Sequence, residues 1–214
     1  EPFDGMSSYL RAFTFHNGFM ERLLIQLVRQ SPVNLRPLLG VKPHASTKGR
    51  GYMAWGYLKN YGFSGEEGYK IRAGRSLEWL MENRSPNARE YGWGNHFDFS
   101  SRGGRLPKHE PTIVWNSLIG QAFLDGYELL QERRYLEIAE SVCRWILRLP
   151  RENTSSGSCL SYVAYQQNSV HNSNMLGAAM LARTARFTGD RKASKVAKEA
   201  MEFSCSRQLG DGAW

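Results

Sequence analysis

The sequence predicts an all-α fold, namely an incomplete (α/α)6-type toroid of antiparallel helical hairpins with about seven helices. Two observations predict it: a unit of two amphipathic helices recurs along the chain, and small residues recur at one place within that unit. The repeats span nearly all of the chain, so we expect a single toroid domain over residues 1–214. A complete ring needs more hairpins than these, so we also expect truncation at the C-terminus.

The clearest repeat relates residues 112–146 to residues 169–203. In the second half of each copy, apolar residues recur at i, i+3, i+7 and i+10, which is the spacing of one helical face. Short polar breaks at residues 131–133 and 188–190 divide each copy into two helices. The apolar positions are Leu136, Ala139, Cys143 and Ile146 in one copy, and Ala193, Val196, Ala200 and Phe203 in the other.

An earlier copy lies between Leu58 and Leu80, with its break within residues 61–68. Before it we expect one longer helix over residues 7–30, because Ser7 and Ser8 can cap its start. The apolar face of this helix consists of Leu10, Phe13, Leu23, Leu24 and Leu27. The pattern contains almost no strand signal.

Small residues near the start of the first helix of each hairpin indicate an inner ring of closely packed helices. They are Gly120 and Ala122 in one copy and Gly177, Ala178 and Ala179 in the other. The second helices carry more charge, so we expect them to form the outer ring.

Composition narrows the class of protein. The net charge of +8 favours an acidic partner, but the cations are spread over separate segments, which is typical of solvated helix faces. We therefore expect no nucleic-acid partner, and no apolar run is long enough for a membrane span. Three cysteines without metal or redox spacing favour a reducing compartment, which predicts a cytoplasmic protein.

The connections between hairpins are the predicted functional segments. They cover residues 85–111, residues 150–169 and a third stretch that begins near Leu209, and all lead to the start of an inner helix. We expect them to gather at one rim, where aromatic rings and polar groups suit a sugar. Asp98 and Glu110 are the candidate catalytic acid and base. The alternatives are a loop carboxylate that binds local N–H groups for Asp98, and a charge favoured before a helix for Glu110.

The candidate substrate-binding residues are Trp93, Asn95, His96, Tyr162, His171, Asn172 and Trp214. Trp93 is equally typical of rim packing, and Asn172 of an ordinary helix cap. The five histidines show no ligand spacing, so we expect no metal site. Nucleotide-binding glycine motifs are absent from the sequence, and we expect no cofactor.

Residues 34–41, 91–99, 112–117 and 170–174 together resemble an uncharacterised family of α/α-toroid, six-hairpin glycosidase-like proteins associated with polysaccharide biosynthesis. The resemblance covers nearly the whole chain and implies a toroid fold. The ending Gln208-Leu209-Gly210-Asp211-Gly212-Ala213-Trp214 is similar to the Q-x-x-D-G-x-W element of terpenoid-cyclase toroids, which implies architecture rather than cyclisation.

Our first hypothesis is a carbohydrate-active protein of polysaccharide biosynthesis or modification, which binds or cleaves a glycan at the aromatic rim. Its partner would be a polysaccharide or oligosaccharide, and the positive charge favours an acidic one. The second hypothesis is a non-catalytic scaffold or sugar-binding helical array. A third is a terpenoid-type cyclase, although the acidic signature of such cyclases is absent.

Overall fold

The computed structural model describes residues 3–86 and 88–213, and it is mostly helical, as predicted. The chain divides into two compact units. Unit 1 comprises Glu1–Thr47 and Gly94–Glu110, and unit 2 comprises Lys48–Trp93 and Pro111–Trp214. The expectation of one domain stays a prediction. Within the described part of the chain, no helix combines the length and the apolar character that crossing a bilayer requires.

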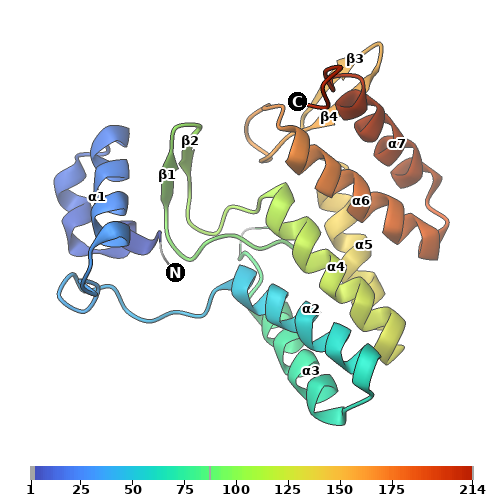
Figure 1. Cartoon of the computed structure of the whole chain (residues 1–214), viewed down its shortest axis with the longest axis horizontal. Helices are drawn as coiled ribbons and strands as arrows, with labels where there is room; N and C mark the ends of the chain where they lie inside the picture. The colour runs from blue at the N-terminus through green and yellow to red at the C-terminus, as the bar shows by residue number, and fades with distance from the viewer. Residues whose placement is uncertain (1–2, 87, 214) are drawn as a thin grey trace. The chain divides into compact units, whose positions relative to one another are not determined.

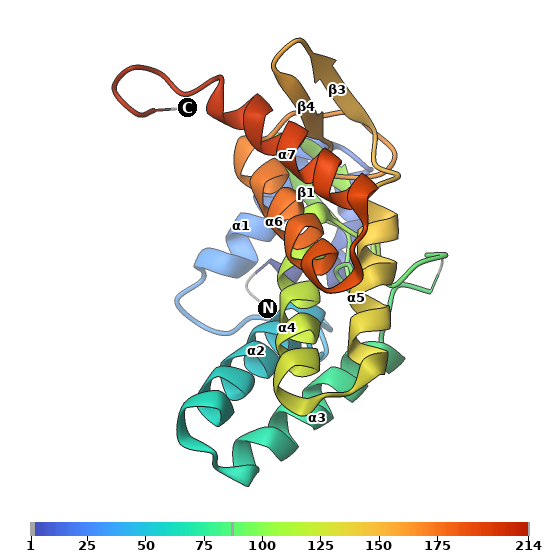
Figure 2. The same ribbon diagram turned by 90° about the vertical axis from the view of Figure 1, so that its right-hand side faces the viewer.

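Unit 2 consists of three helical hairpins, and this confirms the repeat found in the sequence. Figures 1 and 2 show α4 between α2 and α6, with α3, α5 and α7 forming the second helix of each hairpin. The helices are α2 Thr47–Ser64, α3 Glu67–Glu82, α4 Ile113–Leu130, α5 Arg133–Ile146, α6 His171–Thr188 and α7 Arg191–Cys205.

Glycines let the inner helices of unit 2 approach one another, as the sequence predicts. A Cβ atom on Gly120 of α4 would lie 2.5 Å from Cε of Met180 on α6, and one on Gly177 of α6 would overlap Cδ1 of Ile113 on α4. Side chains do not tolerate contacts this short. The neighbouring side chain occupies the space in each case, so the helices pack at close range.

The core of unit 2 fills the space between the two helices of each hairpin. Trp93, Phe123 and Tyr135 form a row of buried rings, with centroids 5.6 Å apart for the first pair and 5.9 Å for the second. Cys143 belongs to the same core, and burial raises its pKa to about 12. It therefore acts as a small apolar residue, as predicted.

The predicted helix over residues 7–30 is wrong as a single element. The segment instead forms η1 Asp4–Ser7, η2 Tyr9–Thr14 and α1 Gly18–Gln30, where η denotes a 3-10 helix. Phe15 and His16 have left-handed φ angles of 49° and 58°, which end the first stretch. Asn17, and not Ser7 or Ser8, caps α1 by accepting hydrogen bonds from the N–H groups of Phe19 and Met20.

The buried face of α1 differs from the predicted one. Leu24, Ile25 and Val28 are buried in unit 1, whereas Leu23 and Leu27 are exposed. Phe13 is also exposed, because it belongs to η2 and not to α1. The break at Phe15–His16 changes the helical register, so the two halves no longer share one face.

The connecting segments contain strands that the sequence did not signal. β1 Phe99–Ser101 pairs with β2 Gly104–Leu106 in unit 1, and β3 Arg151–Thr154 pairs with β4 Gly157–Leu160 in unit 2. Both pairs are antiparallel, and Gly104 and Gly157 have φ angles of 117° and 129° at the turns. These strands of three or four residues are too short for a clear alternating pattern.

Candidate functional site

The predicted site residues fall into both units. Asn95, His96, Asp98 and Glu110 belong to unit 1. Trp93, Tyr162, His171 and Asn172 belong to unit 2, and Trp214 lies outside the described residues.

Asp98 is held in place by basic side chains of unit 1. Its carboxylate forms ion pairs with Arg11 and Arg105, the latter at 3.3 Å, and accepts a hydrogen bond of 2.8 Å from the N–H of Lys108. Arg105 also lies 3.5 Å from the buried carboxylate of Glu21 on α1. These contacts occupy both oxygens of Asp98, so its surroundings match the alternative of a loop carboxylate that fixes the local backbone.

Glu110 has different surroundings. Its carboxyl group is half-buried and has no hydrogen bond or ion pair with any residue that the structure describes. Burial raises its pKa above the usual range for a glutamate, because the charged form loses hydration. A carboxyl group in this state is suited to holding a proton that it can later donate.

The backbone places Glu110 beside the glycine-rich segment of unit 1. The N–H of His109 donates to the carbonyl of Asn95 at 2.6 Å, and a Cβ atom on Gly94 would overlap the backbone of His109 and Glu110. Thr47 donates its hydroxyl to the carbonyl of Gly94. Only glycine fits at position 94, because the backbone of His109 and Glu110 passes directly beside it. Asn95 and Glu110 therefore belong to two neighbouring backbone segments.

His96 lines a cavity of about 570 Å³ in unit 1. Its ring stacks on that of His44, with centroids 4.0 Å apart and planes 13° from parallel. Burial, and then the charge on His44, lower the pKa of His96 to about 4, so its ring is neutral near pH 7. The remaining lining includes Asp4, Asn34, Arg36, Pro37, Gly40, Val41, Lys42 and Pro43.

The polar groups of this cavity differ in how far they are already engaged. Arg36 binds Asp4 through two contacts of 2.8 and 3.1 Å. Asn34 accepts a hydrogen bond from the N–H of Arg36, which leaves its amide NH2 group as a donor. Neither ring nitrogen of His96 is hydrogen-bonded to a described residue. The cavity therefore offers several groups that can bind hydroxyls.

In unit 2, two buried asparagines anchor the connecting segments to the inner helices. Asn116, the fourth residue of α4, accepts a hydrogen bond of 2.8 Å from the N–H of Trp93. Asn174, the fourth residue of α6, accepts one of 2.9 Å from the N–H of Leu160. The N–H of Ile113 also donates to the carbonyl of Tyr162 at 3.0 Å. Within unit 2, two connections therefore meet at the starts of α4 and α6.

Trp93 is a packing residue, which matches the alternative of rim packing. Its side chain is 0% exposed, and the indole N–H donates to the carbonyl of Leu80 at 2.8 Å. Tyr162 is half-buried against the core, and burial raises its pKa. The ring of Trp93 is therefore covered by the core, whereas that of Tyr162 is covered only in part.

His171 and Asn172 begin α6 but do not cap it, because the cap position is Val170. The imidazole Nδ1 of His171 lies 3.2 Å from the hydroxyl of Ser204 on α7, so this ring ties the two helices of a hairpin. Asn172 is exposed. At the chain end, the side chain of Gln208 donates to the carbonyl of Gly212, closing a local turn.

Sequence reasoning missed a polar network between the inner helices of unit 2. Asp125 of α4 is 1% exposed, and its carboxylate binds the indole N–H of Trp55, the ammonium of Lys59 and the guanidinium of Arg183. Arg183 of α6 also donates to Gln121. The only sequence signal was an isolated acidic residue within the apolar stretch of α4.

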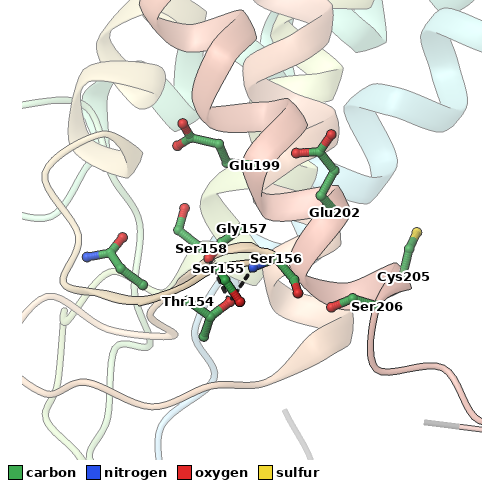
Figure 3. Close-up of a pocket in the computed structure, with 10 residues that line it drawn as sticks. Thr154, Ser155, Ser156, Gly157, Ser158, Glu199, Glu202, Cys205 and Ser206 are labelled. Carbon is green, nitrogen blue, oxygen red and sulfur yellow. Dashed lines mark hydrogen bonds between the residues drawn. The ribbon is translucent and has the colours of Figure 1, made fainter.

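A second cavity, of about 690 Å³, lies between the β3–β4 turn and α7 (Figure 3). Hydroxyl groups of the turn face it from one side, and Glu199 and Glu202 project from α7. It has neither a ring nor a basic side chain among its lining residues. Among the described residues, no three His, Cys, Asp or Glu side chains are grouped so that they could hold a metal ion.

The fold is similar to that of α/α-toroid glycoside hydrolases. A glycoside hydrolase family 76 α-mannanase of Bacteroides thetaiotaomicron aligns with a TM-score of 0.59 at 18% identity, covering 79% of this chain and 46% of its own. An endo-β-1,4-glucanase of Acetobacter xylinum aligns with a TM-score of 0.56 at 14% identity, covering 78% and 50%. This chain thus spans about half the length of these proteins.

An α-1,6-mannanase of Salegentibacter, solved with mannotetrose, aligns with a TM-score of 0.53 at 14% identity, covering 91% of this chain and 55% of its own. That protein is an inactive variant in which two consecutive aspartates are replaced. The present sequence contains no two consecutive aspartates. No family model matches the chain, and no curated protein matches it. The comparisons therefore establish the fold and transfer no catalytic residue.

Proposed function

We propose that this chain belongs to a carbohydrate-active protein of polysaccharide biosynthesis or modification, which binds an oligosaccharide at the unit 1 cavity and cleaves it with Glu110 as proton donor. One observation carries the proposal. Of the four carboxyl side chains that the structure describes in unit 1, only Glu110 has no ion-pair partner. The shared glycosidase fold supports it.

Glycosidic cleavage needs a carboxylic acid that is still protonated when the sugar binds. Partial burial of Glu110 acts in this direction, because it disfavours the charged form and raises the pKa of the carboxyl group. Its neighbour His109 also has a lowered pKa, caused by burial and then by the charges on Lys108 and His44. Glu110 is not among the residues that line the cavity, so the proposal requires the bound glycan to extend from the cavity to Glu110.

A second candidate is sugar binding without cleavage. Hydrolysis usually needs two carboxyl groups, one as acid and one as base or nucleophile. In unit 1, Asp4 is engaged by Arg36, Glu21 by Arg105, and Asp98 by Arg11 and Arg105. These ion pairs leave Glu110 as the one unpaired carboxyl group among the described residues of unit 1. Because hydrolysis usually needs two, this favours binding without cleavage for the chain by itself.

The test compares binding with product formation. The chain is titrated calorimetrically with neutral and acidic oligosaccharides, and the same mixtures are analysed by chromatography for shorter products. We expect Glu110→Gln to bind the glycan as the parent chain does and to release no product. Glu137→Gln, at an exposed site on α5, is the matched control and should cleave normally. Binding without products in the parent chain would favour the second candidate, and absence of binding to every glycan would contradict both.

A further inference from the structure

We propose that the unit 1 cavity selects glycans that carry a carboxylate, and that Lys42 is the residue that recognises this group. This inference rests on the proposed function, because it names the class of sugar that would occupy the site. It goes beyond the comparisons, since the aligned mannanase holds a mannotetrose.

Lys42 is a cation in the cavity lining that no described residue matches with an opposite charge. Arg36 and Asp4 neutralise each other through their direct contacts. His96 is kept neutral by burial and by its neighbour His44. Lys42 lines the cavity and has no ion pair with any residue described in the structure. An anionic group placed there would gain a partner without displacing an existing one.

The size of the cavity favours a sugar over a simple ion. A volume of about 570 Å³ corresponds to roughly twenty water molecules at about 30 Å³ each. An inorganic anion would leave most of this space filled with water. A saccharide unit would fill more of it, and its size lies within the usual range of ligand pockets.

The lining also suits the other parts of an acidic sugar. The amide NH2 of Asn34 and the ring nitrogens of His96 can bind hydroxyl groups. Pro37, Pro43 and the stacked imidazoles present apolar surfaces to the C–H faces of a pyranose ring. The net charge of +8 adds a long-range attraction for an anionic polymer.

The experiment uses two ligands of equal length, an oligouronate and its carboxyl-reduced neutral analogue, titrated calorimetrically into the chain. We expect the oligouronate to bind about fivefold more tightly at low salt, which is the upper range for an exposed ion pair. This preference should vanish in about 0.5 M salt, where charges are screened. Lys42→Gln should lose the preference and keep its affinity for the neutral analogue, while Lys195→Gln on α7 should keep both.

The possible results distinguish failure of this inference from failure of the proposed function. Equal affinity of the parent chain for both ligands would overturn the selection of carboxylates and leave glycan binding intact. A preference that survives Lys42→Gln would overturn the role of Lys42. Inorganic phosphate that competes as strongly as the oligouronate would show a simple anion site and overturn the inference. Binding of neither sugar would overturn both proposals.

Discussion

The side-chain oxygen of Asn116 accepts a hydrogen bond of 2.8 Å from the backbone N–H of Trp93. Asn174 repeats this arrangement one hairpin later with the N–H of Leu160, and its amide nitrogen donates to the carbonyl of Ala200 at 2.7 Å. Each asparagine is the fourth residue of its helix and is fully buried. In each of these two hairpins, a single amide therefore joins the inner helix to the segment that precedes it.

Replacing Asn174 by alanine should reduce the free energy of unfolding by about 3 kcal/mol, because buried donors and acceptors lose their partners. Urea denaturation followed by circular dichroism measures this change. Asn172→Ala is the matched control, since Asn172 is exposed two positions earlier in α6 and should cost less than about 0.5 kcal/mol. Equal effects of the two changes would contradict the anchoring role.

Asp125→Asn should destabilise the chain by about 3 kcal/mol, because Lys59 and Arg183 would lose the carboxylate that they share. Chemical denaturation of the variant checks the value. Glu128→Gln removes only a partly exposed partner of Arg183, and we expect a cost below about 1 kcal/mol. A cost for Asp125→Asn no larger than for Glu128→Gln would show that the network does not hold the inner helices together.

Gly157→Ala should destabilise unit 2 by more than about 3 kcal/mol. Its φ angle is 129°, and an added Cβ would overlap the carbonyl of Glu199 on α7. Gly189→Ala also places alanine at a positive φ angle, of 71°, but in open space, so it should cost about 1 kcal/mol. Thermal unfolding distinguishes the two, and limited proteolysis should cut the β3–β4 hairpin in the first variant only.

Acidification should destabilise the fold through His96. Its pKa falls from 6.5 to about 4 on folding, so below about pH 6.5 the unfolded chain binds a proton that the folded chain does not. The contribution of His96 to the free energy of unfolding is therefore fully present above about pH 6.5. It declines toward pH 4, by at most about 1.4 kcal/mol per pH unit.

The measurement compares urea unfolding at about pH 7.5 and about pH 5 in the parent chain and in His96→Gln. We expect the variant to lose less stability on acidification, because glutamine does not titrate. His16→Gln, at an exposed position, should behave as the parent chain does. The same pH dependence in all three proteins would exclude His96 as the cause.

The helical hairpins of unit 2 were predictable because their signal is local. Leu136, Ala139, Cys143 and Ile146 repeat along one helix face, and all four are buried. The break at Phe15 and His16 was not predictable in this way, because neither residue is a glycine or a proline. Asn17 was an available signal, since asparagine is a preferred cap, but the apolar pattern on both sides of it obscured the boundary.

The candidate site was only partly accessible from the sequence. The composition of a connecting segment indicated Glu110 and His96 as site residues. In the structure, Glu110 is a partly buried acid and His96 lines a cavity. Lys42 and His44 were missed, because they come from a segment distant in sequence from His96. The ion pair of Asp98 with Arg11 and the burial of Trp93 likewise depend on contacts that no local pattern encodes.

The asparagine anchors also bear on how toroids of this kind diversify. Asn116 and Asn174 bind their segments through backbone N–H groups, so these hydrogen bonds do not depend on which side chains stand at Trp93 and Leu160. The backbone at Trp93 and at Leu160 can then stay bound to its inner helix while the rest of each connecting segment changes in length and composition. A change of sequence at either anchor point would therefore keep the segment attached to its inner helix as long as the asparagine is retained.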